Sequence, residues 1–489
     1  MSDKSRPASR PKARLPRGFR DRSGAELAAE RAMLETIRRV YESYGFEPLE
    51  TPAFEYTDAL GKFLPDVDRP NEGVFSLKDD DEQWMSLRYD LTAPLARHVA
   101  ANFQTLAKPF RRYQTGTVWR NEKPGPGRFR EFTQFDADTV GSANPAADAE
   151  LLMMLCDALE ALDLGRGDYI VKINNRKLLD GVLEVAGVPL DDPARRATVL
   201  RAIDKLDRLG VEGVAALLGQ GRKDESGDFT KGAGLDAEQA HRILAFVAPD
   251  AKDEEEHLNQ IARLIESSKI GVEGLVELEK IVGLLMACGY GPDRVMFDTG
   301  VVRGLDYYTG PVWEAQLTGA VTNDAGAAVV FGSIASGGRY DDLVARFTGQ
   351  RVPAAGISIG VSRLLSALKD RRAAAAPLVV VTVFDKTDSA ASFALVRELR
   401  AAGLRAEAYV GNGKMGDQLK YADKRGAAIA VIEGGDERAR GEVTLKDLAL
   451  GAERAKSVES RAEWTATRQA QLSVKRADVV SEIRKMLGR

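Results

Sequence analysis

An alternating run of polar and aromatic side chains falls between residues 131 and 140 of the 489-residue chain. If Glu131 to Val140 form a strand, its period of two places four side chains on one face, namely Phe132, Gln134, Asp136 and Asp138. A buried sheet face is normally apolar, because an unpaired carboxylate is costly there. The pattern therefore indicates either a site for a polar small molecule or a solvent-exposed sheet face.

The segment before this run delivers two more charged groups. Tyr113 to Arg120 also alternates, and residues 121–128 between the two runs are rich in Gly and Pro. The pattern predicts an antiparallel hairpin with a long functional tip. Arg120 and Glu122 lie at the entrance to that tip.

Two short segments elsewhere pair charge with hydroxyl or aromatic groups. Asp90 and Thr92 are expected to share a face of an extended segment, where a carboxylate and a hydroxyl can hold an ammonium group. At Arg303, a permanently charged guanidinium precedes the aromatic pair Tyr307 and Tyr308.

Two later segments combine glycines with arginine. Gly337 and Gly338 would let the backbone approach a ligand. Residues 355–363 are expected to run from a strand into a helix with Arg363 in its first turn, where free N–H groups and the helix dipole favour an anion. Each arginine alone is more often a surface ion-pair residue, so the information lies in their order along the chain.

The elements expected around these segments suggest several domains. A helical stripe runs from Gly24 to Tyr44, and an Ala- and Leu-rich helical stretch covers residues 193–290, interrupted by a mobile loop from Gly219 to Gly234. After an Ala-rich linker at 373–376, strand and helix patterns alternate, which predicts a small α/β domain with a largely parallel sheet. The other expected elements are a strand from Trp84 to Leu91, a helix at 145–163, strands at 296–316, 329–336 and 354–359, a helix from Gly360 to about Lys369, and a last element from Ala462 to Leu487.

Composition excludes several classes of protein. The chain holds 44% apolar and 29% charged residues and lacks the uncharged run of about 20 apolar residues that a membrane span needs. Only Cys156 and Cys288 occur, which excludes a disulfide framework and a Cys-ligated metal cluster. The three histidines lie far apart, which argues against a His-rich metal site. We therefore expect a cytoplasmic protein with no certain metal site, whose catalysis depends on arginines and carboxylates.

Charge is unevenly distributed along the chain. Residues 377–489 hold 20 Lys and Arg against 16 Asp and Glu, which fits a nucleic-acid contact or simply a solvated surface. Residues 1–20 hold seven basic side chains and one acid, Asp3, so we expect a disordered basic arm over residues 1–15. An organellar transit peptide ranks lower, because no apolar helical face precedes Pro16.

Taken in order, these segments resemble one protein family. Arg120-x-Glu122 with the long loop is similar to motif 2 of class II aminoacyl-tRNA synthetases, and the run ending at Arg363 is similar to motif 3. The helix from Gly24, with Pro52 after it, resembles motif 1. Residues 16–21, 303–308 and 337–341 resemble segments peculiar to histidyl-tRNA synthetases. No P-loop or dinucleotide-binding glycine motif competes with this interpretation.

The resemblance implies an α/β fold whose α+β catalytic core is a class II antiparallel sheet with flanking helices. It divides the chain into the disordered arm 1–15, a catalytic core made of residues 16–192 and 291–372, a helical insertion 193–290 between those two core segments, the linker 373–376 and a small α/β anticodon-binding domain 377–489. Motifs 1 and 2 fall in the first core segment, and motif 3 falls in the second with the histidine-specific segments. The resemblance also implies a homodimer that pairs through the motif 1 region.

The implied activity is ATP-dependent activation of L-histidine to histidyl-adenylate, followed by transfer to the 3′ end of histidine tRNA. For ATP, the resemblance implies that Arg120 and Arg303 act as catalytic residues at the α-phosphate. It places Arg128 and Arg363 at the outer phosphates, and Phe132 and Glu122 at the adenine. Mg²⁺ is expected on the phosphates, which supply most of its ligands.

For the amino acid, the resemblance assigns Asp90, Thr92 and Gln134 to the α-ammonium group and Asp138 with Tyr308 to the imidazole ring. A carboxylate on one ring nitrogen and a phenol on the other would fix the tautomer. The implied histidine-binding set also includes Tyr307, Gly337 and Gly338.

Two features depart from the family's usual bacterial pattern. Asp90 and Asp138 stand where Glu is frequent, and residues 121–127 are less basic than usual. Both departures resemble the eukaryotic members. Because this loop approaches the acceptor end of the tRNA, recognition of the extra 5′ guanosine of histidine tRNA stays open.

Two alternatives belong to other classes. The first is a catalytically inactive, synthetase-like regulatory subunit of ATP phosphoribosyltransferase that binds histidine; such subunits usually lack the C-terminal domain and an arginine at position 303, and this chain has both. The second is an RNA-binding or interaction module on a synthetase core. A complete set of phosphate-binding arginines argues against it.

Overall fold

The chain separates into two compact units, Met1–Arg372 and Ala373–Arg489. The computed structural model describes residues 12–63, 73–125, 129–188, 191–223, 227–248, 254–301, 307–319, 321–322, 328–329, 332–368, 376–384, 389–448, 450 and 471–488. Arg128, Arg303 and most of the linker 373–376 lie outside these residues. Within the described portion of the chain, no helix combines the length and apolar composition that a membrane span requires.

A mixed sheet forms the centre of the first unit. Its eight described strands lie in the order β1-β5-β6-β15-β14-β11-β7-β10. The pairs from β5 through to β7 are antiparallel, whereas the edge strands β1 and β10 pair in parallel with β5 and β7. The strand bounds are β1 Glu47–Pro48, β5 Phe110–Trp119, β6 Glu131–Val140, β7 Tyr169–Asn175, β10 Val295–Phe297, β11 Pro311–Leu317, β14 Ala335–Arg339 and β15 Ala354–Ile359. The predicted hairpin and antiparallel sheet are therefore confirmed.

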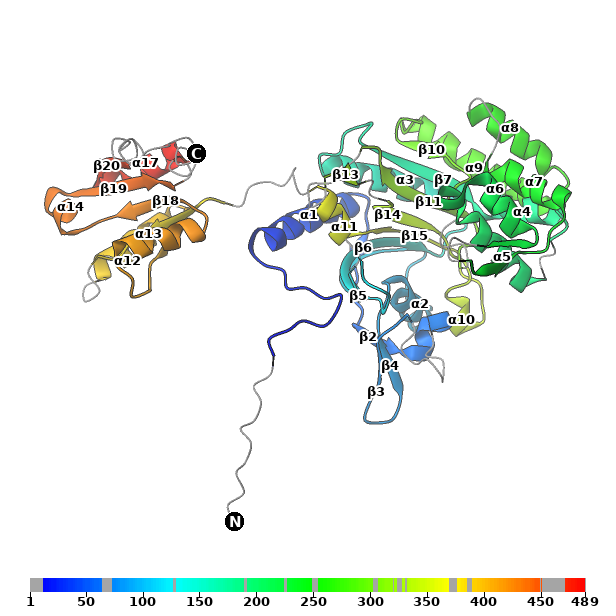
Figure 1. The fold of residues 1–489 in the computed structure, drawn as a ribbon, viewed down its shortest axis with the longest axis horizontal. Coiled ribbons are helices and arrows are strands. Elements are labelled where there is room, and N and C mark those ends of the chain that lie inside the picture. Colours follow the sequence, from blue (N-terminus) through cyan, green and yellow to red (C-terminus); the bar gives the residue numbers. More distant parts are fainter. Residues whose placement is uncertain are drawn as a thin grey trace, which may run out of the picture. The chain divides into compact units, whose positions relative to one another are not determined.

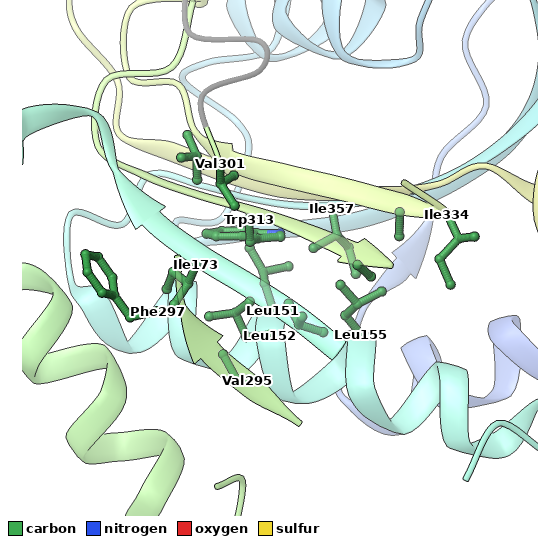
Figure 2. Packing of buried hydrophobic residues seen from close by; sticks show 14 of the residues in the cluster. Leu151, Leu152, Leu155, Ile173, Val295, Phe297, Val301, Trp313, Ile334 and Ile357 are labelled. Atoms are coloured by element: carbon green, nitrogen blue, oxygen red, sulfur yellow. The ribbon is translucent and has the colours of Figure 1, made fainter. Parts of the chain in front are cut away.

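Helices cover one face of this sheet (Figure 1). They are α1 Gly24–Ser43, α3 Pro145–Ala161 and α11 Val361–Ala367. Leu151 and Leu155 of α3 pack with Trp313 and Ile357 of the strands, and all four are at most 2% exposed (Figure 2). Burial of apolar surface at this interface stabilises the unit.

The predicted stripe of α1 is a core stripe. Met33, Ile37 and Tyr41 are buried, and the Tyr41 ring lies 5.0 Å from that of Phe135 in β6. The helix ends where Gly45 adopts a φ of +79°, a conformation that favours glycine and stops the helical pattern. The apolar residues of this helix therefore stabilise their own unit.

Most of the helical stretch that follows β7 is confirmed. Its helices are α4 Arg176–Val185, α5 Pro193–Ile203, α6 Leu206–Leu218, α7 Ala237–Val247, α8 Glu254–Leu264 and α9 Lys269–Ala287. The expected mobile loop is instead a short hairpin of β8 Gly221–Lys223 and β9 Phe229–Lys231. Helix α9 packs on α3 and α4, and it crosses α4 where a Cβ on Gly181 would lie 2.6 Å from the Cα of Gly271.

A small three-stranded sheet precedes the hairpin. It has the order β2-β4-β3, with β2 Phe54–Tyr56, β3 Ser76–Lys78 and β4 Trp84–Leu87. A 3₁₀ helix, Thr57–Phe63, and α2 Thr92–Ala101 pack beside it. The expected strand from Trp84 to Leu91 is too long, because the chain turns after Leu87 and enters α2. Elsewhere in this unit, β12 Val321–Thr322 pairs with β13 Ala328–Val329, and α10 spans Ala345–Thr348.

The second unit is an α/β domain, as predicted, but its sheet is mixed. The strand order is β17-β16-β18-β19-β20; β16 pairs in parallel with β17 and β18, and the two pairs that follow are antiparallel. The last expected element contains a strand and a helix within its described portion. The bounds are β16 Leu378–Val381, α12 Ala390–Ala401, β17 Arg405–Ala408, α13 Met415–Lys424, β18 Ala427–Ile432, α14 Gly435–Arg440, β19 Glu442–Asp447, β20 Gln471–Lys475 and α17 Val479–Met486.

Candidate active site

The polar face predicted for β6 continues across its neighbours. Strand pairing places Arg112 of β5 opposite Asp138, and Asp138 opposite Gly356 of β15. Directly paired residues in neighbouring strands point to the same face. The adjacent row on that face consists of Gln114, Asp136 and Ser358.

This face is buried. The exposed fraction is 9% for Gln134 and 2% for both Asp136 and Asp138. The alternative of a solvent-exposed sheet face is therefore wrong. Since buried polar groups normally require polar partners, the face is a candidate ligand site.

Asp138 is held on both sides by protein groups. Arg112, which is fully buried, places Nη2 2.7 Å from Asp138 Oδ2. The hydroxyl of Tyr340 donates a hydrogen bond to Oδ1. A Cβ at position 356 would overlap the carboxylate, so glycine there gives Asp138 its room.

Several polar atoms around Asp138 lack hydrogen-bond partners among the described residues. They are Oε1 of Gln134, Oδ1 of Asp136, and Nε and Nη1 of Arg112. Gln134 is nevertheless fixed, because its Nε2 donates to Ser358 Oγ at 2.9 Å. Acceptors and donors left unpaired in a fixed, buried arrangement suit a ligand that carries both kinds of group.

The acids of this face favour a cationic ligand. Burial raises the pKa of Asp136 to about 7 and also raises the pKa of Asp90 and Asp138, although the nearby Arg112 opposes all three shifts. Asp138 and Asp90 raise the pKa of Asp136 further by repulsion. A ligand ammonium group would relieve that repulsion.

Asp90 and Thr92 lie close together, but not on a strand. Oδ1 of Asp90 accepts the backbone N–H of Thr92 at 3.2 Å and of Ala93 at 2.9 Å. Asp90 therefore caps the first turn of α2, where free N–H groups need acceptors. The prediction of a shared strand face is wrong, and the turn into α2 brings the two residues together instead.

A second group of predicted residues gathers at the start of β6. The guanidinium of Arg120 lies 5.1 Å from the Phe132 ring centroid, and its Nε donates to Tyr89 O at 3.2 Å. Ser362, the neighbour of Arg363, accepts the backbone N–H of Thr133 at 3.0 Å. This bond joins the first turn of α11 to β6.

Two residues predicted to bind ATP are at the surface, one assigned to the outer phosphates and one to the adenine. Arg363 is exposed and donates to Ser333 O at 2.5 Å, and Glu122 is also exposed. These exposed positions suit contact with a solvent-facing part of a ligand. The buried row at Asp138 suits a part of the ligand that is enclosed by protein. Arg128 and Arg303 lie outside the described residues, so their assignments stay predictions.

Gly337 and Gly338 serve packing in the described structure. On one face, a Cβ on Gly337 would overlap Trp313 and the carbonyl of Gly356; on the other, a Cβ on Gly338 would lie 2.8 Å from the Tyr308 ring. The rings of Tyr307 and Tyr308 lie 4.2 Å apart and line a cavity of about 580 Å³. A ligand approach to these glycines stays a prediction.

Sequence reasoning missed Arg112, Tyr340 and Ser358 as members of the site. Arg112 was detectable in principle, because the register of the predicted hairpin places it opposite Asp138. Tyr340 lies about 200 positions from Asp138, and no periodicity connects the two.

We predict that Asp136→Asn stabilises the first unit increasingly as the pH rises. The raised pKa means that the folded state holds a proton on Asp136 that the unfolded chain has already released. The stability of the parent protein therefore falls as the pH rises from about 4 to about 7, and the loss remains above pH 7. The gain should reach about 1.4 kcal/mol for each unit by which the pKa is raised. Urea unfolding at pH 5 and pH 8 measures it. Asp81→Asn, at an exposed position, is the control, and an equal effect of Asp136→Asn at both pH values would contradict the prediction.

Comparison with known proteins assigns both units. A family model described as histidyl-tRNA synthetase matches residues 18–364, and one described as an anticodon-binding domain matches residues 378–486. A protein named histidine–tRNA ligase from Rhizobium leguminosarum bv. trifolii is 58% identical, covering 100% of this chain and 97% of its own. Another of that name from Caulobacter vibrioides is 56% identical, covering 98% of this chain and 97% of its own.

Solved structures agree with these sequence matches. The crystal structure of histidyl-tRNA synthetase from Nostoc sp. PCC 7120 has a TM-score of 0.72 at 31% identity, covering 97% of this chain and 100% of that chain. A Bacillus halodurans structure described as an ATP phosphoribosyltransferase regulatory subunit/histidyl-tRNA synthetase is 22% identical with a TM-score of 0.66, which shows the fold alone. The full-length ligase matches therefore do not favour the regulatory-subunit alternative. The chain belongs to the histidyl-tRNA synthetase family.

Proposed function

We propose that this protein activates L-histidine with ATP and transfers the histidyl group to the 3′ end of histidine tRNA. The observation that carries the proposal is the buried row of Gln134, Asp136 and Asp138, whose unpaired polar atoms fit a small ligand with donors and acceptors. Membership of the family supplies the substrate class.

In this mechanism the α-ammonium group of histidine binds between Gln134, Asp90 and Thr92. Oε1 of Gln134 is buried without a partner among described residues and can accept one N–H of the ammonium group. Asp90, already ordered by the start of α2, supplies negative charge. Binding then stabilises the ionised form of the acids, because an opposite charge lowers a carboxyl pKa.

The imidazole ring binds to Asp138 and Tyr308. Arg112 and Tyr340 hold the Asp138 carboxylate. These two neighbours fix the position of the carboxylate, although Asp has a shorter side chain than the Glu that is frequent at this position in the family. A carboxylate can only accept hydrogen bonds when ionised, so it selects an N–H of the ring. An amino acid without that N–H would leave buried groups unpaired, which is how such a pocket rejects analogues.

ATP binds where Arg120 and Phe132 lie together. Phe132 stacks on the adenine, with Arg363 on its other side, and Glu122 accepts from the adenine amino group. Arg120 and Arg303 hold the histidine carboxylate against the α-phosphate and stabilise the charge that develops at phosphorus. Arg363 and Arg128 bind the outer phosphates.

Mg²⁺ would accompany ATP. The described residues contain no group of three or more His, Cys, Asp or Glu side chains that could hold a metal ion. The ion would therefore take most of its ligands from phosphate oxygens and water, and it would neutralise phosphate charge during adenylate formation.

The second unit recognises the tRNA, and we place the protein in the cytoplasm. The match to an anticodon-binding domain and the excess of basic residues in 377–489 support a nucleic-acid contact there. The helical insertion, residues 193–290, contacts the acceptor stem.

We also propose a homodimer that pairs through the motif 1 region. Directly after Pro52, the small sheet exposes an apolar face, because Tyr56, Met85 and Leu77 are cross-strand partners and point to one side. Tyr56 is 56% exposed and Leu77 43%. A second copy of the chain would cover this face.

The first test is histidine-dependent exchange of pyrophosphate into ATP. Exchange with histidine alone among the amino acids is expected. Charging of histidine tRNA transcripts with and without the extra 5′ guanosine, measured beside it, shows whether the enzyme requires that nucleotide. Histidine binding without exchange would instead support the regulatory-subunit alternative.

Arg303→Ala should slow this exchange about a hundredfold or more, because it removes one preorganised charge stabiliser of the transition state. The affinity for histidine, measured by calorimetry, should change far less. An unchanged exchange rate in this variant would refute the role of Arg303.

Arg112→Gln should raise KM for histidine about tenfold to a hundredfold, the scale of a hydrogen bond to a charged group, and leave KM for ATP unchanged. Arg111→Gln is the matched control, because Arg111 is the neighbouring residue and pairs with Glu150 at 2.9 Å instead. Equal effects of the two variants, or equal effects on both KM values, would show that Arg112 has a structural role only.

Tyr56→Asp should weaken self-association, which sedimentation equilibrium measures against the 53.1 kDa mass of one chain. Trp84→Asp is the control, since Trp84 is 40% exposed on the opposite face of the same small sheet. A monomeric parent protein, or a stronger effect of the control, would contradict pairing through this face.

A further inference from the structure

The segment before α1 is attached to the base of the long loop between β5 and β6. The backbone N–H of Arg130 donates to Gly18 O at 2.9 Å, and the Arg20 guanidinium lies 4.5 Å from the Phe129 ring centroid. Phe19 contacts Phe75, with ring centroids 5.9 Å apart. Figure 1 shows this blue segment extending toward the β5–β6 hairpin before it turns back to α1.

Gly18 makes the attachment close. It has a φ of +85°, and a Cβ there would lie 2.9 Å from Arg130 Cγ and 3.2 Å from Pro124 Cβ. Only glycine adopts this conformation without strain and leaves the space for both neighbours. The segment is therefore fixed beside the loop at a defined point.

Unpaired positive charge directly precedes this attachment in the chain. Lys12, Arg14 and Arg17 are exposed and form no ion pair with any described residue, and Lys123 in the loop is exposed as well. The two arginines that follow are different, because they bind acids. Arg20 pairs with Glu26, and Arg22 pairs with Glu30.

The five residues at the tip of the loop offer few donors to a polyanion. Residues 123–127 are Lys-Pro-Gly-Pro-Gly, so one side chain carries positive charge, and the two prolines lack a backbone N–H. The sequence before Lys12 adds Lys4, Arg6 and Arg10 against the single acid Asp3. The N-terminal segment therefore adds positive charge to the basic residues Arg120, Arg128 and Arg130 that flank the tip of the loop.

We propose that Lys12, Arg14 and Arg17 form a phosphate-binding surface for the acceptor arm of the tRNA. The inference rests on the proposed function, because transfer requires the 3′ end of the tRNA to reach the α-phosphate site at Arg120. Arg120 begins the loop, so the neighbouring acceptor phosphates must pass close to the N-terminal segment. Lys and Arg bind phosphates without regard to sequence, and their exposure leaves them free to do so.

The test replaces all three residues by alanine in the full-length protein. We expect KM for histidine tRNA to rise about tenfold and the slope of log KM against log salt to fall by roughly two to three, near 0.9 for each lost phosphate contact. Pyrophosphate exchange, which needs no tRNA, should be unchanged, and this shows that the variant is folded. A minihelix with the acceptor and T arms alone should show the same loss.

The control removes three exposed cations elsewhere in the same unit, Arg39, Arg166 and Lys280. Charging by that variant should match the parent protein. Equal KM and salt dependence in the N-terminal variant and the parent would overturn the proposal, as would a loss seen with full tRNA but not with the minihelix. Failure of exchange in the parent protein would instead refute the proposed function.

Discussion

The buried ion pair between Arg112 and Asp138 is the constraint on which the site depends. Three carboxylates, Asp90, Asp136 and Asp138, lie in a region of low dielectric where ionisation is costly, and burial raises the pKa of each. Arg112 is the buried guanidinium that opposes these shifts. The Tyr340 hydroxyl completes the arrangement, so one carboxylate is fixed while polar atoms around it stay unpaired.

One sheet serves stability and chemistry on its two faces. The face toward α3 is apolar, and Trp313 and Ile357 pack there with leucines of the helix. The opposite face holds the acids, Gln134 and Ser358. Because successive strand residues alternate between the faces, the same ten residues of β6 supply core contacts and the ligand-facing groups. The free-energy cost of burying carboxylates on one face is offset by the apolar surface that is buried on the other face.

The glycines in the sheet connect these two roles. Gly356 makes room for the Asp138 carboxylate, Gly337 for Trp313, and Gly338 for the Tyr308 ring. Side chains from neighbouring segments thus lie over the backbone of β14 and β15 without overlap. The sequence pattern at Gly337 and Gly338 predicted that the backbone there approaches a ligand. In the described structure, both glycines are needed for packing, one on each face of the sheet.

The sequence by itself determined the hairpin, the polar face of β6, the core stripe of α1 and the α/β character of the second unit, because each depends on local periodicity. It also carried the ordered motifs of the histidyl-tRNA synthetase family, which the full-length relatives confirm. The tertiary structure alone decided that the polar face is buried, that Asp90 caps α2, and that Tyr340 joins Arg112 in holding Asp138. It also decided that the C-terminal sheet is mixed and that the segment around Gly18 lies against the loop. These features depend on strand register and on contacts between residues far apart in sequence, which neither composition nor periodicity encodes.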